Sequence, residues 1–168
     1  MWLNHLQWLP KAVFAASQRM DNVGPVDEIL TEVDCGDGKK AILGREGENL
    51  YFCTMQRTKG IFWRRVGAEY FTRAYLQEYE QIILAKYYWN RDFLFGICRE
   101  PGAKEISFQL VGEEENFLME GKLPVREDGI FYGSNIRGII LDGSAYPYHL
   151  RALDAEENVI AGEVEGVL

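Results

Sequence analysis

The sequence predicts a mostly β, α+β protein with an N-terminal helix, an antiparallel β-meander and then a sandwich-like antiparallel β module. Three observations lead to this fold class. Short apolar runs are separated by many glycines (17) and few prolines (5), which is typical of β-rich proteins with frequent turns. The run Glu105–Val111 alternates apolar and polar residues, which indicates a strand with one buried face. The run Phe93–Cys98 is apolar throughout, as in strands that are buried on both faces.

We expect these two runs to form an antiparallel pair at the centre of the β core. Side chains alternate across a strand, so Ile106, Phe108 and Leu110 fall on the same side. Pro101 and Gly102 stand between the two runs and mark a turn. The rest of the second half is therefore expected to build on this pair.

The first half is expected to begin with a helix and continue as a meander. Pro10 suits the first turn of a helix, and the Gly24-Pro25 pair ends it. Gly36-Asp37-Gly38 is a hairpin turn signal. Residues 69–79 fit either a helix or a strand. The expected elements are a helix that begins at Pro10 and stops near Asn22-Val23-Gly24-Pro25, and strands at Glu28–Cys35, Lys40–Gly44, Asn49–Arg57, Ile61–Val66 and Gln81–Trp89.

The second half is expected to be a sandwich of short strands separated by turns at regular spacing. Asp128-Gly129 and Asp142-Gly143 are two of the turn signals. After the central pair, the expected strands are Phe117–Leu123, Ile130–Ser134, Gly138–Leu141, Tyr146–Leu153 and Val159–Val164.

Length and charge set limits on organisation and partners. The 168 residues are 47% hydrophobic and 13% aromatic, enough for one continuous domain or two small modules packed together. A candidate boundary at Asn90-Arg91 divides residues 1–90 from residues 91–168. By count, residues 1–90 hold 11 Lys and Arg against 11 Asp and Glu, whereas residues 91–168 hold 7 against 15. This acidic second half would repel phosphates, so no nucleic-acid partner is expected.

The three cysteines do not form a disulfide framework. Cys35, Cys53 and Cys98 are an odd number without a CxxC spacing, and each lies in an apolar, strand-like run. There, cysteine behaves as a small hydrophobic residue. A single bridge between Cys35 and Cys53 is left open, because their strands could be neighbours.

The sequence contains no transmembrane segment, since no run of about 18 apolar residues is present. The N-terminal residues 1–17 lack a basic region, and Pro10-Lys11 interrupts their apolar part. We read them as part of the fold. The location is therefore cytoplasmic as the sequence stands, or extracytoplasmic if a leader or tether has been removed. The sequence does not indicate the oligomeric state.

No catalytic, metal or cofactor motif stands out. The two histidines, His5 and His149, do not have zinc-ligand spacing with the cysteines. His149 is expected on the surface of its strand, on the same side as Arg151. A cysteine–histidine nucleophile pair would need a solvent-reachable thiol beside His149, and all three cysteines are expected to be buried. We therefore expect no cofactor, no metal and no enzyme activity.

Two groups of side chains are candidates for binding. Three consecutive aromatic residues, Tyr87, Tyr88 and Trp89, could line a site for a sugar ring or another small ligand. The second group mixes cations with aromatic rings, as in surfaces that stack nucleic-acid bases, although its half of the chain is neutral overall. It comprises Arg57, Lys59, Arg64, Arg65 and Arg73 with Phe62, Trp63, Tyr70 and Phe71.

The order of elements also carries a resemblance. An apolar strand at Phe93–Cys98 is followed by a proline turn, a strand at Lys104–Phe108 and the run Leu150–Ile160. In this order, over about residues 26–165, the chain resembles a loose set of small, uncharacterised β-rich proteins of Gram-positive bacteria, which are often exported or membrane-tethered. The resemblance implies a folded part outside the cell and supplies no catalytic residues.

Together, these observations predict a non-enzymatic binding or accessory module that acts through a protein or cell-envelope partner. The alternative is a small-ligand or carbohydrate-binding domain that uses the strand aromatics Tyr87, Tyr88 and Trp89.

Overall fold

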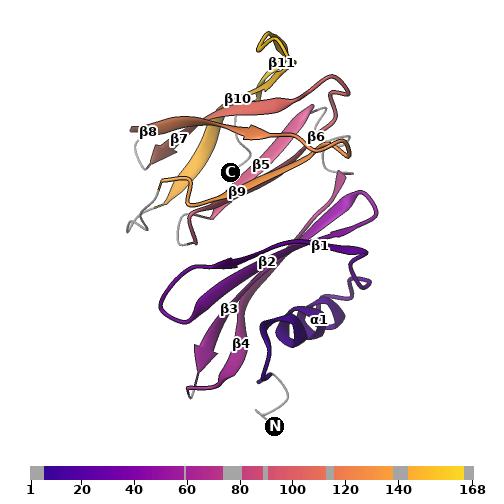
Figure 1. Ribbon diagram of the computed structural model, residues 1–168, viewed down its shortest axis with the longest axis vertical. Helices are drawn as coiled ribbons and strands as arrows, with labels where there is room; N and C mark the ends of the chain where they lie inside the picture. Colours follow the sequence, from indigo (N-terminus) through magenta and orange to yellow (C-terminus); the bar gives the residue numbers. More distant parts are fainter. Residues whose placement is uncertain are drawn as a thin grey trace. The chain divides into compact units, whose positions relative to one another are not determined.

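The computed structural model describes residues 6–58, 60–73, 81–88, 91–112, 116–137 and 144–164. These residues form one helix and eleven strands in three antiparallel sheets (Figure 1). The mostly β, α+β class expected from the sequence is confirmed. The chain divides into two compact units, Met1–Arg73 and Ala74–Leu168.

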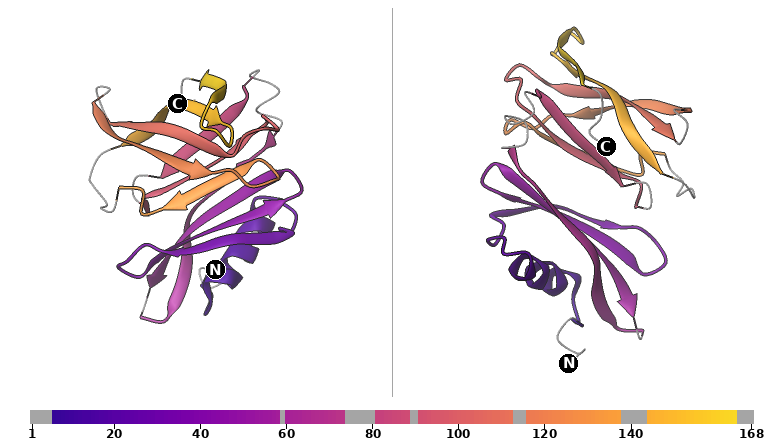
Figure 2. Two further views of the ribbon diagram at one scale, coloured as in Figure 1. Left: turned by 45° about the horizontal axis from the view of Figure 1, so that its top comes forward. Right: turned by 180° about the vertical axis from the view of Figure 1, so that it is seen from behind.

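The first unit is a helix packed on one face of a four-stranded meander (Figures 1 and 2). The helix starts where it was expected, with Pro10 in its first turn and the extended residue Leu9 before it. It ends before Asn22, which has a φ of 55°. The elements are α1 (Pro10–Met20), β1 (Glu28–Asp34), β2 (Lys39–Glu46), β3 (Asn49–Thr58) and β4 (Phe62–Phe71), and the sheet order is β1-β2-β3-β4.

The turn between β1 and β2 shows why the meander forms. Gly36, Asp37 and Gly38 all have positive φ angles, of 72°, 50° and 66°. Glycine adopts this conformation without the steric cost that a Cβ would bring. The hairpin expected at these residues is therefore confirmed.

The core of the first unit lies between the helix and the sheet. Val13 and Phe14 of α1 are buried against the central strands. The Phe14 ring meets the Tyr51 ring edge-on, with centroids 5.4 Å apart. On the sheet side, the buried members are Ile42, Tyr51, Cys53, Met55 and Trp63.

The second unit is a sandwich of two sheets (Figure 2). One sheet has the order β11-β10-β7-β8 and the other the order β5-β6-β9. Strand β5 packs against β10, and a bridge between Val125 and Phe131 joins the sheets near β8 and β9. The strands are β5 (Ile83–Tyr88), β6 (Phe93–Cys98), β7 (Glu105–Gly112), β8 (Phe117–Pro124), β9 (Ile130–Ser134), β10 (Ala145–Leu153) and β11 (Val159–Val164).

The predicted central pair is wrong in one respect: β6 and β7 are both strands, but they belong to different sheets. β6 pairs with β5 and β9, whereas β7 pairs with β10 and β8. The connection crosses between the sheets, because the Arg99 amide donates to the Ile82 carbonyl beside β5 and the Lys104 amide donates to the Leu153 carbonyl on β10. A turn such as Pro101-Gly102 does not require that the strands before and after it pair with each other as a hairpin.

Along the sequence, the boundary between the two units lies between Arg73 and Ala74, which is earlier than the candidate boundary at Asn90-Arg91. The reason is strand pairing: β5 forms an antiparallel ladder with β6, in which Tyr88 faces Phe93. β5 therefore belongs with the sandwich. Residues 74–79, Trp89 and the strand expected at Gly138–Leu141 lie outside the described residues.

Gly96 allows the three-stranded sheet to pack closely. A Cβ at this position would overlap the carbonyl oxygen of Leu84 and the ring of Phe131, and it would lie 2.9 Å from the Cα of Ala85. Real Cβ contacts do not come so close, so only glycine fits at this point of β6.

Candidate functional site

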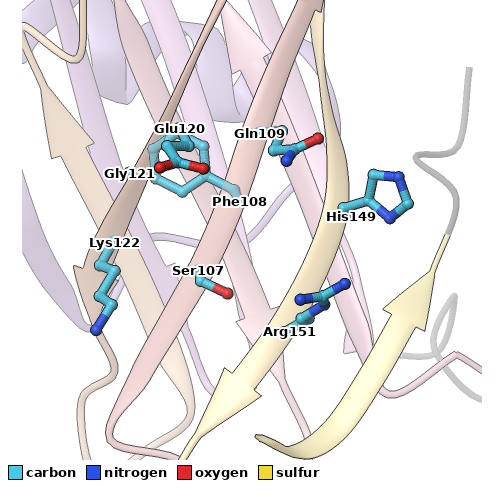
Figure 3. Close-up of a pocket in the computed structure, with 8 residues that line it drawn as sticks. All are labelled: Ser107, Phe108, Gln109, Glu120, Gly121, Lys122, His149 and Arg151. Carbon is cyan, nitrogen blue, oxygen red and sulfur yellow. The ribbon is translucent and has the colours of Figure 1, made fainter. Parts of the chain in front are cut away.

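A polar trough of about 420 Å³ lies on the β11-β10-β7-β8 sheet of the second unit (Figure 3). It is on the face away from the sandwich core, because Ser107 and Gln109 alternate along β7 with the buried residues Ile106, Phe108 and Leu110. Its volume is in the range of small-ligand sites, about 300–1,000 Å³. The lining residues are Ser107, Phe108, Gln109, Glu120, Gly121, Lys122, His149 and Arg151.

Strand register sets the polar side chains of the trough in rows. Ser107 on β7 pairs with Lys122 on β8 and with Arg151 on β10, so two cations flank one hydroxyl. Neighbouring strands are about 4.8 Å apart, which places the two cationic residues about 10 Å apart at their Cα atoms. In the next row, Gln109 pairs with Glu120. The trough thus offers two cations, one carboxylate, a hydroxyl and an amide.

A β-bulge in β10 adds His149 to this face. Tyr148 pairs with Gln109 and Arg151 pairs with Ser107, so two residues of β10 lie opposite one residue of β7. Of these two, Leu150 enters the core and His149 lines the trough. His149 has a φ of 47°, a left-handed conformation that costs a residue with a Cβ about 1 kcal/mol. Its ring meets Tyr148 edge-on at 4.0 Å, and it is half-buried rather than a plain surface residue.

The ion pairs of Lys122 affect the charge of the trough. The Lys122 ammonium lies 2.9 Å from a carboxylate oxygen of Glu157 and 3.7 Å from one of Glu105. The hydrogen bond to Glu157 raises the pKa of Lys122, so this side chain stays cationic. Such exposed pairs are worth little and can rearrange around a ligand.

The predicted aromatic site does not assemble as one surface. The Tyr87 ring is 5% exposed and belongs to the sandwich core, and its hydroxyl donates to Asp92 Oδ1 at 2.6 Å. Tyr88 projects to the other side of β5 and stacks on Phe95, with centroids 6.0 Å apart. Successive strand residues point to opposite faces, which is why neighbours in sequence do not share a site here. Trp89 lies outside the described residues.

The cysteines occupy structural positions. Cys53 and Cys98 are buried as expected, whereas the expectation of a buried Cys35 is wrong because this residue is partly exposed, and none of the three forms a disulfide bond. The open possibility of a Cys35–Cys53 bridge is excluded, because β2 separates β1 from β3 in the sheet. Burial raises the pKa of the Cys53 thiol to about 11, which keeps it protonated and unreactive near neutral pH.

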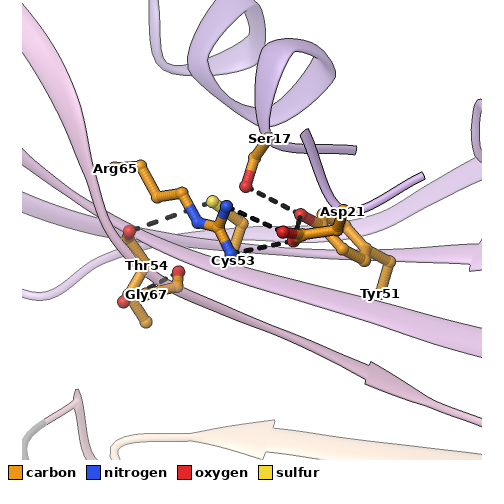
Figure 4. Close-up of polar contacts among 7 residues, drawn as sticks. All are labelled: Ser17, Asp21, Tyr51, Cys53, Thr54, Arg65 and Gly67. Carbon is orange, nitrogen blue, oxygen red and sulfur yellow. Dashed lines mark hydrogen bonds and ion pairs between the residues drawn. The ribbon is translucent and has the colours of Figure 1, made fainter. Parts of the chain in front are cut away.

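Cys53 lies beside a polar network between α1 and the sheet that the sequence analysis did not single out (Figure 4). The Tyr51 hydroxyl donates to Asp21 Oδ2 at 2.6 Å and is 2.7 Å from Ser17 Oγ. The Arg65 guanidinium binds both oxygens of Asp21, at 2.9 and 2.8 Å. Burial, followed by the bond to Asp21, raises the pKa of Tyr51. These hydrogen bonds connect Asp21, at the C-terminal end of α1, to β3 through Tyr51 and to β4 through Arg65.

The basic and aromatic group of the first unit does not form one stacking surface. Trp63 and Phe71 are buried. Two of its cations pair with acids: Arg65 with Asp21, and Arg73 with Glu48 at 3.1 Å. Buried rings cannot stack on bases, and paired cations attract phosphates weakly.

Within the residues that the structure describes, no group of three or more His, Cys, Asp or Glu side chains is arranged so that it could hold a metal ion. No helix in this part of the chain has the length and apolar character needed to cross a membrane.

No protein-family model matches this chain, and no curated protein or solved structure matches it. The resemblance to exported proteins of Gram-positive bacteria stays a prediction.

Proposed function

We propose that this protein is a non-enzymatic binding module that holds a protein or cell-envelope partner through the polar trough on β7, β8 and β10. The observation that carries the proposal is the conformation of His149. A residue other than glycine occupies the left-handed region inside a strand, at a bulge where His149 is one of the residues that line the trough.

Bulges and strained residues are found at functional sites more often than elsewhere, because a bulge can re-aim a side chain. Glycine would fill this position without strain. The strain at His149 is therefore consistent with a side chain that is kept for binding. The surrounding groups, Gln109, Ser107 and Arg151, can all donate hydrogen bonds to a partner.

The carbohydrate alternative through Tyr87, Tyr88 and Trp89 has less support. Tyr87 is fixed in the core, and Tyr88 is on the opposite side of its strand. A ligand would have to displace the Tyr87–Asp92 hydrogen bond to reach both rings.

Affinity capture from the native host, followed by fractionation, tests the proposal and identifies the partner. We expect His149→Gly to lose the partner while stability stays within about 1 kcal/mol of the unmodified protein, because relief of the left-handed strain offsets the lost contact with Tyr148. The melting temperature, measured alongside, separates this result from misfolding.

The matched control is Asn135→Gly, which also changes a residue with a positive φ (54°) in the second unit, but outside the trough. It should capture the partner as the unmodified protein does. Capture that is unchanged in both His149→Gly and Arg151→Gln would contradict the proposal.

A further inference from the structure

We infer that the first unit docks onto the surface of an anionic lipid bilayer through an aromatic tip formed by Trp8, Leu9, Ile61 and Phe62. The tip lies where the segment before α1 meets the turn between β3 and β4, at one end of the first unit (Figure 1). It is separate from the trough, which belongs to the second unit.

Backbone pairing builds the tip from two distant segments. The Gln7 amide donates to the Trp63 carbonyl at 3.0 Å, and the Trp63 amide donates to the Gln7 carbonyl at 2.7 Å. This antiparallel bridge places Trp8 beside Phe62, and the centroids of their rings are 4.5 Å apart. Leu9 and Ile61 flank the ring pair in the sequence. Four apolar side chains therefore meet at the same end of the sheet.

The side chains of the tip are unusually open to solvent. Trp8 and Leu9 are each 65% exposed, more than any other large hydrophobic side chain in the described part of the chain, and Ile61 is 53% exposed. Single exposed apolar residues are common, but a contiguous group marks an interaction surface. Tryptophan is enriched at the level of lipid headgroups, because its ring is amphipathic.

The charge around the tip matches an anionic surface. The two segments that supply the tip, residues 6–20 and 50–68, together contain six Lys and Arg and no Asp or Glu. Three of these cations, Lys11, Arg57 and Arg64, are exposed. Each basic residue near a bilayer that contains anionic lipids strengthens its attraction to that bilayer. A tip that combines exposed apolar side chains with cations is typical of proteins that lie on membranes.

Two acids from other segments must be set against these cations. Asp21 binds Arg65, which therefore does not contribute to the attraction. Asp37 lies in the β1–β2 turn, where the Gly38 carbonyl accepts a hydrogen bond from the Arg57 amide, and Lys39 follows it and offsets its charge. Within the described part of the chain, Arg57 makes no ion pair, and its guanidinium lies 5.2 Å from the centroid of the Trp63 ring. The surroundings of the tip thus stay cationic.

The geometry of the tip favours a bilayer over two other occupants. Nucleic-acid bases stack on the free face of an aromatic ring, but the Trp8 and Phe62 rings pack on each other at 56°. A second copy of the chain, docked tip to tip, would bring the cations of both copies together. A bilayer needs no groove and accepts apolar side chains and cations at the same time.

Vesicle co-sedimentation at low salt tests the inference. The protein is mixed with vesicles of phosphatidylcholine alone, and with vesicles that contain about one third phosphatidylglycerol. We expect binding to the mixed vesicles to be at least about tenfold tighter than to phosphatidylcholine, because several cations act together. Added salt should weaken it.

Variants separate the apolar and the charged contributions. Trp8→Ser and Ile61→Ser should each weaken binding to the mixed vesicles at least about fivefold, because less apolar surface enters the bilayer. Arg64→Gln should weaken it about fivefold, whereas Arg64→Lys should keep it. The melting temperature of each variant shows that it is folded.

The second unit offers matched controls. Phe117 is 60% exposed but follows three consecutive glutamates in the sequence, and Lys104 is an exposed cation. Phe117→Ser, Lys104→Gln and the trough variant His149→Gly should all bind vesicles as the unmodified protein does.

Several results would overturn the inference: no binding to either kind of vesicle, equal binding to both, or full affinity in Trp8→Ser and Arg64→Gln. Sedimentation velocity without vesicles tests the second copy, since a dimer that Trp8→Ser dissociates would assign the tip to self-association. Binding of oligothymidine that Trp8→Ser abolishes would assign it to nucleic acid. Partner capture that depends on Arg151 would be unaffected by any of these outcomes, so the proposed function is tested separately.

Discussion

Each unit of this protein contains a hydrogen bond of 2.6 Å from a buried tyrosine to an aspartate, but the two bonds have different surroundings. In the first unit, Tyr51 reaches Asp21 at the end of the helix, where Arg65 and solvent also contact the carboxylate. In the second unit, Tyr87 reaches Asp92, which is 3% exposed.

The two hydrogen bonds have different surroundings because different elements cover the two sheets. A helix covers one face of the first meander, and its end leaves room for water beside Asp21. In the second unit the sheet is covered by a second sheet, and the polar ends of buried side chains must find partners inside. Asp92 does so by accepting from Tyr87 and from the Arg137 amide at 2.9 and 3.0 Å. Polar bonds should therefore matter more to the stability of the second unit.

The largest expected effect is at Gly96 in the second unit. Gly96→Ala should lower the free energy of unfolding by about 3 kcal/mol or more, because the new methyl group overlaps Leu84 and Phe131. Gly67→Ala is the matched control in a strand of the first unit. Its Cβ would lie 3.5 Å from Thr54 Oγ1, so it should cost less than about 1 kcal/mol. Denaturant unfolding measures both, and equal losses would mean that the two sheets are packed equally tightly.

Alkaline pH should weaken the first unit through Cys53. Below about pH 9 the thiol is protonated in both the folded and the unfolded chain. Between pH 9 and pH 11 the unfolded chain releases this proton while the folded chain keeps it, because burial raises the folded pKa from 9.0 to about 11. Stability should therefore fall as pH rises, by about 2–3 kcal/mol over this window.

Hydrogen exchange, read on peptides of each unit, locates this loss. Cys53→Ala should reduce the pH dependence for the first unit, and the part that remains above about pH 10 comes from Tyr51, whose pKa is also raised in the folded chain. Cys98→Ala in the second unit is the matched control and should leave that slope as it is. An unchanged slope in Cys53→Ala would show that the thiol is not the cause.

Removal of each tyrosine hydroxyl tests whether the tyrosine–aspartate hydrogen bond contributes more to stability in the second unit than in the first. Tyr87→Phe should cost about 2 kcal/mol, because it takes a donor from a buried carboxylate. Tyr51→Phe should cost about 1 kcal/mol, because Asp21 keeps Arg65 and water. Thermal unfolding of both variants measures the difference, and a greater loss in Tyr51→Phe would reverse the comparison.

The smallest expected effect concerns the reactivity of the three cysteines rather than the stability of the fold. Cys35 follows β1 and is partly exposed, whereas Cys53 and Cys98 are buried. Iodoacetamide at pH 8 should therefore modify Cys35 at least about tenfold faster than the other two. Peptide mass spectrometry measures the three rates, and rapid modification of Cys53 in the native state would show that the first unit opens easily.

Much of the fold could be predicted from local patterns, but little of the site could be. The strand at Glu105–Gly112 follows from its alternation, and the polar positions of Ser107 and Gln109 were visible in it. Nothing local indicated that Lys122 and Arg151 flank Ser107, since each lies on another strand. The bulge at His149 was also hidden, because the sequence around it contains no glycine that would suggest one.

The sequence by itself determined the fold class, a helix that begins at Pro10 and the existence of each described strand, because periodicity and turn residues are properties of neighbours along the chain. Only the tertiary structure decided that β6 and β7 enter different sheets, that Tyr87 turns into the core, and that Lys122 and Arg151 lie on the strands on either side of Ser107. The physical reason is that strand partners are selected by contacts between distant segments. A shift of register by one residue exchanges the two faces of a strand.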